Sequence, residues 1–194
     1  YLESGWFAPL KTTTTLVIVA FWLTFARHLG RVEFIAGVLA LLFCAAGDTA
    51  LLFSQGFIYG LSFFLVGHLL FVVVFQRLSG TSLSYSALVV VLLVSCGYYL
   101  FLFPQLIHLA IPVALYMCVI SLMAAWGATV WLHHRTSGSL MILLGALSFL
   151  LSDSVLAYNR FIHSDPWLHV VVLTTYWLSL ILIVNGAVRH TTKP

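Results

Sequence analysis

Seven long apolar stretches follow one another along the 194-residue chain, and only short polar or turn-rich segments interrupt them. Only 7% of the residues are charged, whereas a soluble domain carries roughly 25%, so the chain cannot cover a water-facing surface. Each stretch is apolar all round and close to the ~20 residues that a helix needs to cross a bilayer. The sequence therefore predicts an all-α, polytopic transmembrane bundle of about seven helices, with spans at residues 12–26, 34–53, 57–76, 83–103, 108–132, 138–158 and 167–188.

The short loops leave no room for a second domain, so we expect residues 1–194 to form a single integral membrane domain. The net charge of +3 reflects the bias of the loops rather than binding to nucleic acid. Seven spans place the two chain ends on opposite sides of the membrane, and the cations are unevenly divided between these sides. The N-terminal side has Lys11 and Arg160, whereas the C-terminal side has Arg27, Arg31, Arg77, Arg135, Arg189 and Lys193. The positive-inside rule then predicts a cytoplasmic C-terminus, in a plasma or inner membrane.

Three ionisable residues lie inside the predicted spans: Asp48, His68 and Asp153. An ionisable group inside a span costs several kcal/mol and is a functional candidate by default. Each of the three follows a small residue, and small residues let helices approach closely, so these faces are expected to point into the bundle. A single buried aspartate often does no more than bond a neighbouring helix. Two buried aspartates at matching depth, with Tyr116 and Tyr176 in the same layer of the bilayer, favour a functional site.

Two carboxylates in a low-dielectric site cannot both ionise easily, so one of them is expected to keep its proton. A protonated acid beside a carboxylate is the arrangement that cleaves acid-labile C–O bonds through oxocarbenium-like states. At the depth of these two carboxylates in the bilayer, the bond within reach is the one that joins a lipid tail to glycerol. Lys11, and Arg160 with Asn159, are candidates for holding a lipid phosphate, although snorkelling to the interface explains the cations as well.

Several ordered segments resemble the YhhN-like lysoplasmalogenase family over essentially the whole chain. They are Pro9-Leu10, Gly47-Asp48-x-x-Leu51-Leu52, Gly60-x-x-x-Phe64-x-x-Gly67-His68-x-x-Phe71, Tyr116 with Ser121 and Met123, Gly145-Ala146-x-x-Phe149-x-x-Ser152-Asp153-x-x-x-Ala157-x-Asn159-Arg160-Phe161, and Thr175-Tyr176. Ala8, Phe71 and Leu180 depart from the family pattern of Lys, Tyr and Gln. The family commonly has eight spans, so seven with an outside N-terminus is what loss of the first helix would give.

The resemblance implies hydrolysis of the vinyl-ether bond of lysoplasmalogens, which yields a fatty aldehyde and a glycerophospho-base. Asp48 and Asp153 are the expected acid and cation-stabilising carboxylate, in either order, and His68 would tune them or hold water. The expected substrate is a lysophospholipid from the bilayer, bound among membrane lipids, and no cofactor or metal is required. Substrate binding is assigned to Tyr116, Tyr176, Asn159, Arg160, Lys11, Ser152 and Thr175.

Two other functions remain open. A metal-dependent lipid hydrolase of the seven-helix ceramidase type could use the two aspartates and His68 with His108 or His169 as zinc ligands. No span carries two histidines at the i, i+4 spacing that such a site favours. Alternatively, a small transporter or lipid-binding protein could relay protons through the two aspartates. Pro112 is the only proline well inside a span, so the broken helices typical of transporters are not indicated.

Overall fold

A computed structural model describes residues 7–53 and 55–190, with side chains from residue 11 onward. The described residues form seven α-helices and one short 3₁₀ helix, and they contain no strand. The helices are α1 (Phe7–Phe25), α2 (Arg31–Ala50), α3 (Phe57–Ser79), α4 (Tyr85–Leu106), α5 (Ala110–His134), α6 (Ser137–Phe161) and α7 (Pro166–His190), with η1 (Ile107–Leu109) between α4 and α5. The predicted all-α bundle is therefore confirmed.

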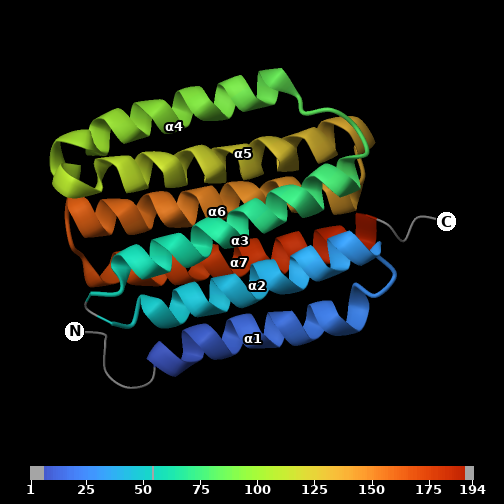
Figure 1. Ribbon diagram of the computed structural model, residues 1–194, viewed down its shortest axis with the longest axis horizontal. Coiled ribbons are helices and arrows are strands. Elements are labelled where there is room, and N and C mark those ends of the chain that lie inside the picture. Colours follow the sequence, from blue (N-terminus) through green and yellow to red (C-terminus); the bar gives the residue numbers. More distant parts are fainter. Residues whose placement is uncertain (1–6, 54, 191–194) are drawn as a thin grey trace.

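By length and composition, five helical stretches among the described residues can cross a membrane. One of them, Tyr85–His134, contains both α4 and α5, which run antiparallel in Figure 1. The apolar part of α1, Lys11–Phe25, is shorter. The chain is thus an integral multi-pass membrane protein, and each of the seven predicted spans has its own helix.

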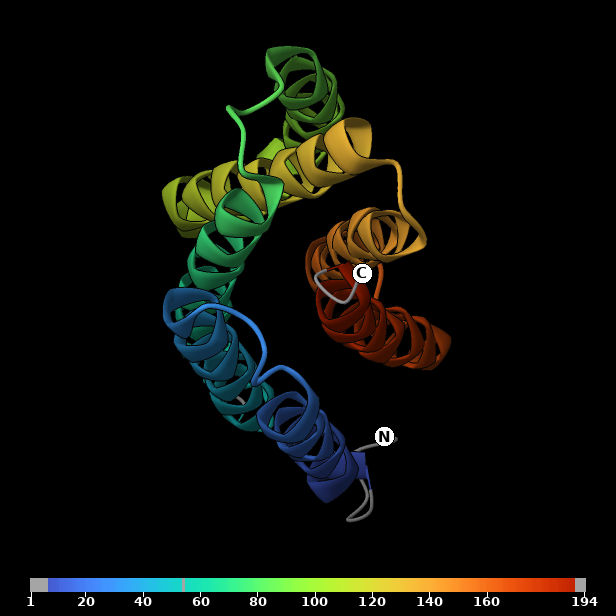
Figure 2. The same cartoon turned by 90° about the vertical axis from the view of Figure 1, so that its right-hand side faces the viewer.

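Helices α1, α2, α3, α5, α6 and α7 curve around a common centre (Figure 2) and form a ring through their contacts. Helix α1 packs on α2, α2 on α3, α3 on α5, α5 on α6 and α6 on α7, and contacts between α1 and α7 complete the circuit. Helix α4 lies outside the ring against α5. Only Ser95, Leu102 and Leu106 of α4 are buried. The ring therefore has an inner face on which polar groups can be kept away from lipid.

Glycines let neighbouring helices of the ring approach closely. A Cβ atom at Gly67 of α3 would lie 3.2 Å from the Ala40 carbonyl oxygen of α2. At Gly145 of α6, a Cβ atom would lie 2.9 Å from the Ser179 carbonyl oxygen of α7. Gly67, which precedes His68, and Gly145, about two turns before Asp153 on α6, therefore both pack helix against helix.

Several helix ends differ from the predicted spans, and two of the differences concern the helices that carry the aspartates. Helix α2 ends at Ala50, three residues before the predicted end, because the chain turns back there, with the Phe53 amide donating to the Ala50 carbonyl. Helix α6 continues to Phe161, three residues beyond the predicted end. Asp48 therefore lies two residues from the end of its helix, whereas Asp153 lies eight residues from the end of α6. Lys193 lies outside the described residues.

Candidate active site

Each of the six ring helices contributes one residue to a group of polar side chains inside the ring. We call this group the polar centre: Thr15 (α1), Asp48 (α2), His68 (α3), Tyr116 (α5), Asp153 (α6) and Tyr176 (α7). Five of the six are buried, and Asp153 exposes 13% of its side chain. The external helix α4 contributes none. The three ionisable residues and two tyrosines predicted from the sequence thus converge, and Thr15 is the member that the sequence did not indicate.

On the Asp48 side of the polar centre, three oxygens form a triangle that two hydrogen bonds hold together. The Thr15 hydroxyl donates to Asp48 Oδ2 at 2.7 Å, and the Tyr176 hydroxyl donates to the same oxygen at 2.8 Å. The two hydroxyl oxygens lie 3.2 Å apart. Asp48 is only 3% exposed. Because the triangle joins α1, α2 and α7, it ties together the helices at which the ring closes.

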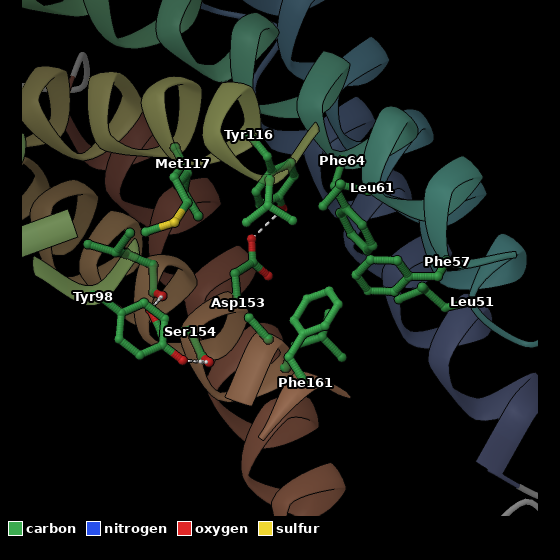
Figure 3. Close-up of a pocket in the computed structure, with 15 residues that line it drawn as sticks. Leu51, Phe57, Leu61, Phe64, Tyr98, Tyr116, Met117, Asp153, Ser154 and Phe161 are labelled. Carbon is green, nitrogen blue, oxygen red and sulfur yellow. Dashed lines mark hydrogen bonds between the residues drawn. The ribbon is translucent and has the colours of Figure 1, made fainter. Parts of the chain in front are cut away.

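Asp153 has fewer polar neighbours. The Tyr116 hydroxyl donates a short hydrogen bond to Asp153 Oδ2 (Figure 3). The Nε2 atom of His68 lies 3.9 Å from the same oxygen, which is beyond hydrogen-bond distance. The His68 imidazole is completely buried and packs edge-on against Phe149, with ring centroids 4.4 Å apart.

Aromatic rings pack around the tyrosine that bonds Asp48. Phe149 lies edge-on to Tyr176 at 5.4 Å and to Phe64 at 6.3 Å between ring centroids. Phe64 in turn contacts Tyr176 at 5.8 Å. Asp48 and Asp153 each accept from a different tyrosine, so they form two separate hydrogen-bonded units.

An apolar pocket reaches the polar centre at Asp153 (Figure 3). Its walls come from α3, α4, α5 and α6 and from Leu51 after α2. Among the described residues of the wall, Asp153 is the only one with a carboxyl group and none is basic; Tyr116 lies beside it. Asp48 does not line the pocket. A long apolar substrate in this pocket would therefore meet one carboxylic group, that of Asp153.

A cation stands at the N-terminal-side rim of the pocket. The guanidinium carbon of Arg160 lies 5.3 Å from the centre of the Phe57 ring, and Phe57 packs edge-on against Phe161. Both phenylalanines line the pocket, whereas Arg160 is itself exposed. Arg160 therefore places a positive charge at this end of the pocket, about two helical turns from Asp153 along α6.

The remaining residues assigned to substrate binding do not line the pocket. Ser152 donates to the Val172 carbonyl of α7, and Thr175 donates to the Val171 carbonyl of its own helix. The Asn159 side chain accepts from the Asp165 amide and contacts His169, so it supports the turn between α6 and α7. Tyr176 bonds Asp48. Lys11 lies one turn before Thr15 on α1 and is also outside the pocket.

No group of three or more His, Cys, Asp or Glu side chains with metal-binding geometry occurs in the part of the chain that the structure describes. His108 and His169, the additional ligands that a zinc hydrolase would need, are both exposed. The polar wall residues that sequence reasoning missed are Ser154 of α6 and Tyr98 of α4. Tyr98 is the one on the external helix. Its hydroxyl donates to the Ser154 carbonyl at 2.6 Å, and no periodicity in the uniformly apolar α4 singles it out.

The chain matches the YhhN family over residues 6–187. It is 32% identical over 190 residues to lysoplasmalogenase TMEM86B of Homo sapiens, an alignment that covers 96% of this chain and 78% of the human protein. It is 34% identical to lysoplasmalogenase TMEM86B of Mus musculus, over 78% of this chain and 62% of the relative. A lysoplasmalogenase of Mycobacterium tuberculosis is 32% identical over 76% of this chain and 58% of its own length. No solved structure matches the chain.

Proposed function

Because the chain belongs to the YhhN family, we propose that it is a lysoplasmalogenase, a membrane hydrolase that cleaves the vinyl-ether bond of lysoplasmalogens. Its products are a fatty aldehyde and a glycerophospho-base. The single observation that carries this proposal is Asp153, a carboxylic group on the wall of an otherwise apolar pocket within the membrane bundle. Curated relatives named lysoplasmalogenase support the same reaction.

The proposed chemistry starts with Asp153 as the general acid. A vinyl ether accepts a proton on the carbon that is not bonded to oxygen, and the adjacent carbon becomes an oxocarbenium ion. The Asp153 carboxylate that remains stabilises this cation at close range in a low-dielectric pocket. Because Tyr116 already donates to Oδ2, Oδ1 is the oxygen that we assign to proton delivery.

Asp48 is proposed to act as a positioning residue. It does not line the pocket, and both of its hydrogen bonds hold helices of the ring together. Tyr176, which bonds Asp48, packs against Phe149, and Phe149 packs against His68. Through these ring contacts Asp48 helps to hold the His68 imidazole in place beside Asp153. His68 is placed with Asp153 in this proposal because its Nε2 atom lies 3.9 Å from Asp153 Oδ2.

Arg160 is proposed to bind the lipid phosphate. The glycerol backbone separates the phosphate of a lysophospholipid from its vinyl ether by only a few bonds, and Arg160 lies about two helical turns from Asp153 on α6. The tail would then lie along the apolar wall formed by residues such as Met117, Ile120 and Leu150. With the cation-poor N-terminal side outside, the rim faces the outer leaflet and the C-terminus is cytoplasmic.

The test is aldehyde release by purified protein from a lysoplasmalogen, with an ester-linked lysophospholipid of the same head group as the control substrate. Hydrolysis of the vinyl ether but not of the ester is the expected result. Ester cleavage at a comparable rate would point to a general lipase. No turnover of either lipid by folded protein would contradict the proposal. Retention of activity after chelation and dialysis separates this reaction from that of a metal-dependent hydrolase.

A further inference from the structure

Hydrolysis needs a water molecule as well as a proton, and the pocket wall offers few groups to hold one. The wall hydroxyls already donate their hydrogens. Tyr116 donates to Asp153, Tyr98 to the Ser154 carbonyl, and Ser154 to the Leu150 carbonyl. The other lining residues are apolar. No wall hydroxyl has a free hydrogen to offer a water, so a second partner for a water beside Asp153 has to come from behind the wall.

His68 is such a group. Both ring nitrogens are buried, and neither has a hydrogen-bond partner among the residues that the structure describes. Buried polar atoms are nearly always satisfied, by protein or by water. The imidazole cannot turn away to find another partner, because the Phe149 and Tyr116 rings pack edge-on against it, with centroids at 4.4 and 5.3 Å. Its nearest acidic group is Asp153.

We propose that a water molecule bound between His68 Nε2 and Asp153 Oδ2 is the nucleophile of the hydrolysis. The two atoms lie 3.9 Å apart. This separation is too long for a direct hydrogen bond, but it lets one water lie about 2.8 Å from each atom. A single water thereby satisfies the imidazole and stands beside the acid. This inference rests on the proposed function, and it assigns to His68 the binding of the second substrate.

The proton balance of the reaction fits this arrangement. Asp153 gives its proton to the vinyl carbon that is not bonded to oxygen, which leaves an oxocarbenium ion and a carboxylate. The water oxygen then bonds to the cationic carbon, and the proton that this water loses passes to the Asp153 carboxylate, which is again a carboxylic acid. The hemiacetal collapses as its hydroxyl proton moves to the glycerol oxygen. The C–O bond breaks, and aldehyde and alcohol leave with one water consumed.

Deuterium labelling separates the protonation step from the water step. In D₂O, wild-type protein should release aldehyde with deuterium at the carbon next to the carbonyl, and the unreacted lysoplasmalogen should contain none, because water captures the cation at once. In His68→Leu, protonation still occurs, but the cation returns to vinyl ether more often than it is captured. We expect aldehyde release to fall about 100-fold, with deuterium appearing in the recovered substrate.

Two further variants complete the experiment. His68→Gln retains a polar group that can hold water, so it should release aldehyde at least several-fold faster than His68→Leu. A direct charge pair between His68 and Asp153 would gain nothing from glutamine. His133→Leu changes an exposed histidine at the far end of the bundle and should behave as wild type. Because His68 has no hydrogen bond to lose, the leucine variant is expected to fold, which size-exclusion and thermal unfolding in detergent will establish.

Several results would overturn the proposed water site. One is a wild-type rate of aldehyde release in His68→Leu. Another is slow release by His68→Leu without deuterium in the recovered substrate, which would place His68 in the protonation step. A third is glutamine and leucine variants that are equally slow. Absence of aldehyde from the wild-type protein would overturn the proposed function and the water site together, so the two failures are distinguishable.

Discussion

Asp48 and Asp153 occupy opposite helices of the ring, and their surroundings differ in every respect that matters for chemistry. Asp48 accepts two hydrogen bonds on one oxygen, is 3% exposed and does not line the pocket. Asp153 accepts one hydrogen bond from a side chain, exposes 13% of its side chain and forms part of the pocket wall. Two identical side chains in equally apolar helices can thus have different roles, because their neighbours decide what each oxygen contacts.

The largest expected effect comes from replacing each aspartate by asparagine. Asp153→Asn removes the proton donor, so kcat should fall by roughly 10³-fold or more. Asp48→Asn retains a carbonyl oxygen that accepts from Thr15 or Tyr176, and we expect a loss of only about 10-fold, the effect of one weakened hydrogen bond on positioning. Aldehyde release measures both. Equal losses in two folded variants would abolish the distinction between the acids and give both a part in the chemistry.

The next effect concerns the hydroxyl that holds the pocket acid. Tyr116→Phe removes the hydrogen bond to Asp153 Oδ2 and leaves the ring in place. A hydrogen bond to a charged group contributes about 1.5–3 kcal/mol, so kcat should fall roughly 10- to 100-fold while KM changes little. Tyr99→Phe is the matched control, because that hydroxyl donates to the Ala110 carbonyl outside the pocket. A large rise in KM with unchanged kcat would instead assign Tyr116 to substrate binding.

A smaller effect tests the rim of the pocket. Arg160→Gln should raise KM for a lysoplasmalogen about 10-fold, equivalent to about 1.4 kcal/mol, with kcat nearly unchanged, because the lost charge acts on the phosphate and not on the vinyl ether. Arg135→Gln is the control, since Arg135 also lies over an aromatic ring, Trp131, at 4.0 Å from the centroid, but at the other end of the bundle. If both variants shift KM equally, general attraction between cations and lipid explains the result.

The smallest expected effect concerns the triangle around Asp48. Thr15→Val and Tyr176→Phe each remove one of its hydrogen bonds. Interhelical hydrogen bonds in membranes contribute roughly 0.6 kcal/mol on average and at most about 1.7. The midpoint temperature of thermal unfolding in detergent should therefore fall by a few degrees in each variant, while KM stays near the wild-type value. Thr24→Val, which loses only a bond to its own helix, should not shift the transition. If both test variants unfold at the wild-type temperature, the hydrogen bonds to Asp48 do not contribute to closing the ring.

The architecture of the bundle was predictable from the sequence because bilayer thickness dictates the length of an apolar helix. The same physics exposes Asp48, His68 and Asp153, since ionisable groups in apolar runs are costly and therefore rare. Thr15 was not predictable in this way. A threonine in a membrane helix can bond its own backbone at little cost, and here it does so with the Lys11 carbonyl as well as bonding Asp48.

The substrate-binding set was predicted less well, because its members are polar residues whose partners depend on tertiary structure. The Ser152 hydroxyl bonds a carbonyl of the neighbouring helix α7, and Asn159 supports the next turn. Nothing in the local sequence distinguishes such residues from ones that face a pocket. Tyr98 was overlooked for the same reason, since α4 is apolar on every face and its position outside the ring follows only from packing.

The junction of α1 with α7 has a consequence for how the protein is made. The first and last described helices meet there, and Thr15 and Tyr176 bond the same oxygen although 161 residues separate them. A ribosome must therefore deliver α7 to the membrane before Asp48 has both of its partners. A translation product interrupted before α7 lacks this closure, so the polar centre is completed late in membrane insertion rather than as its first helices enter.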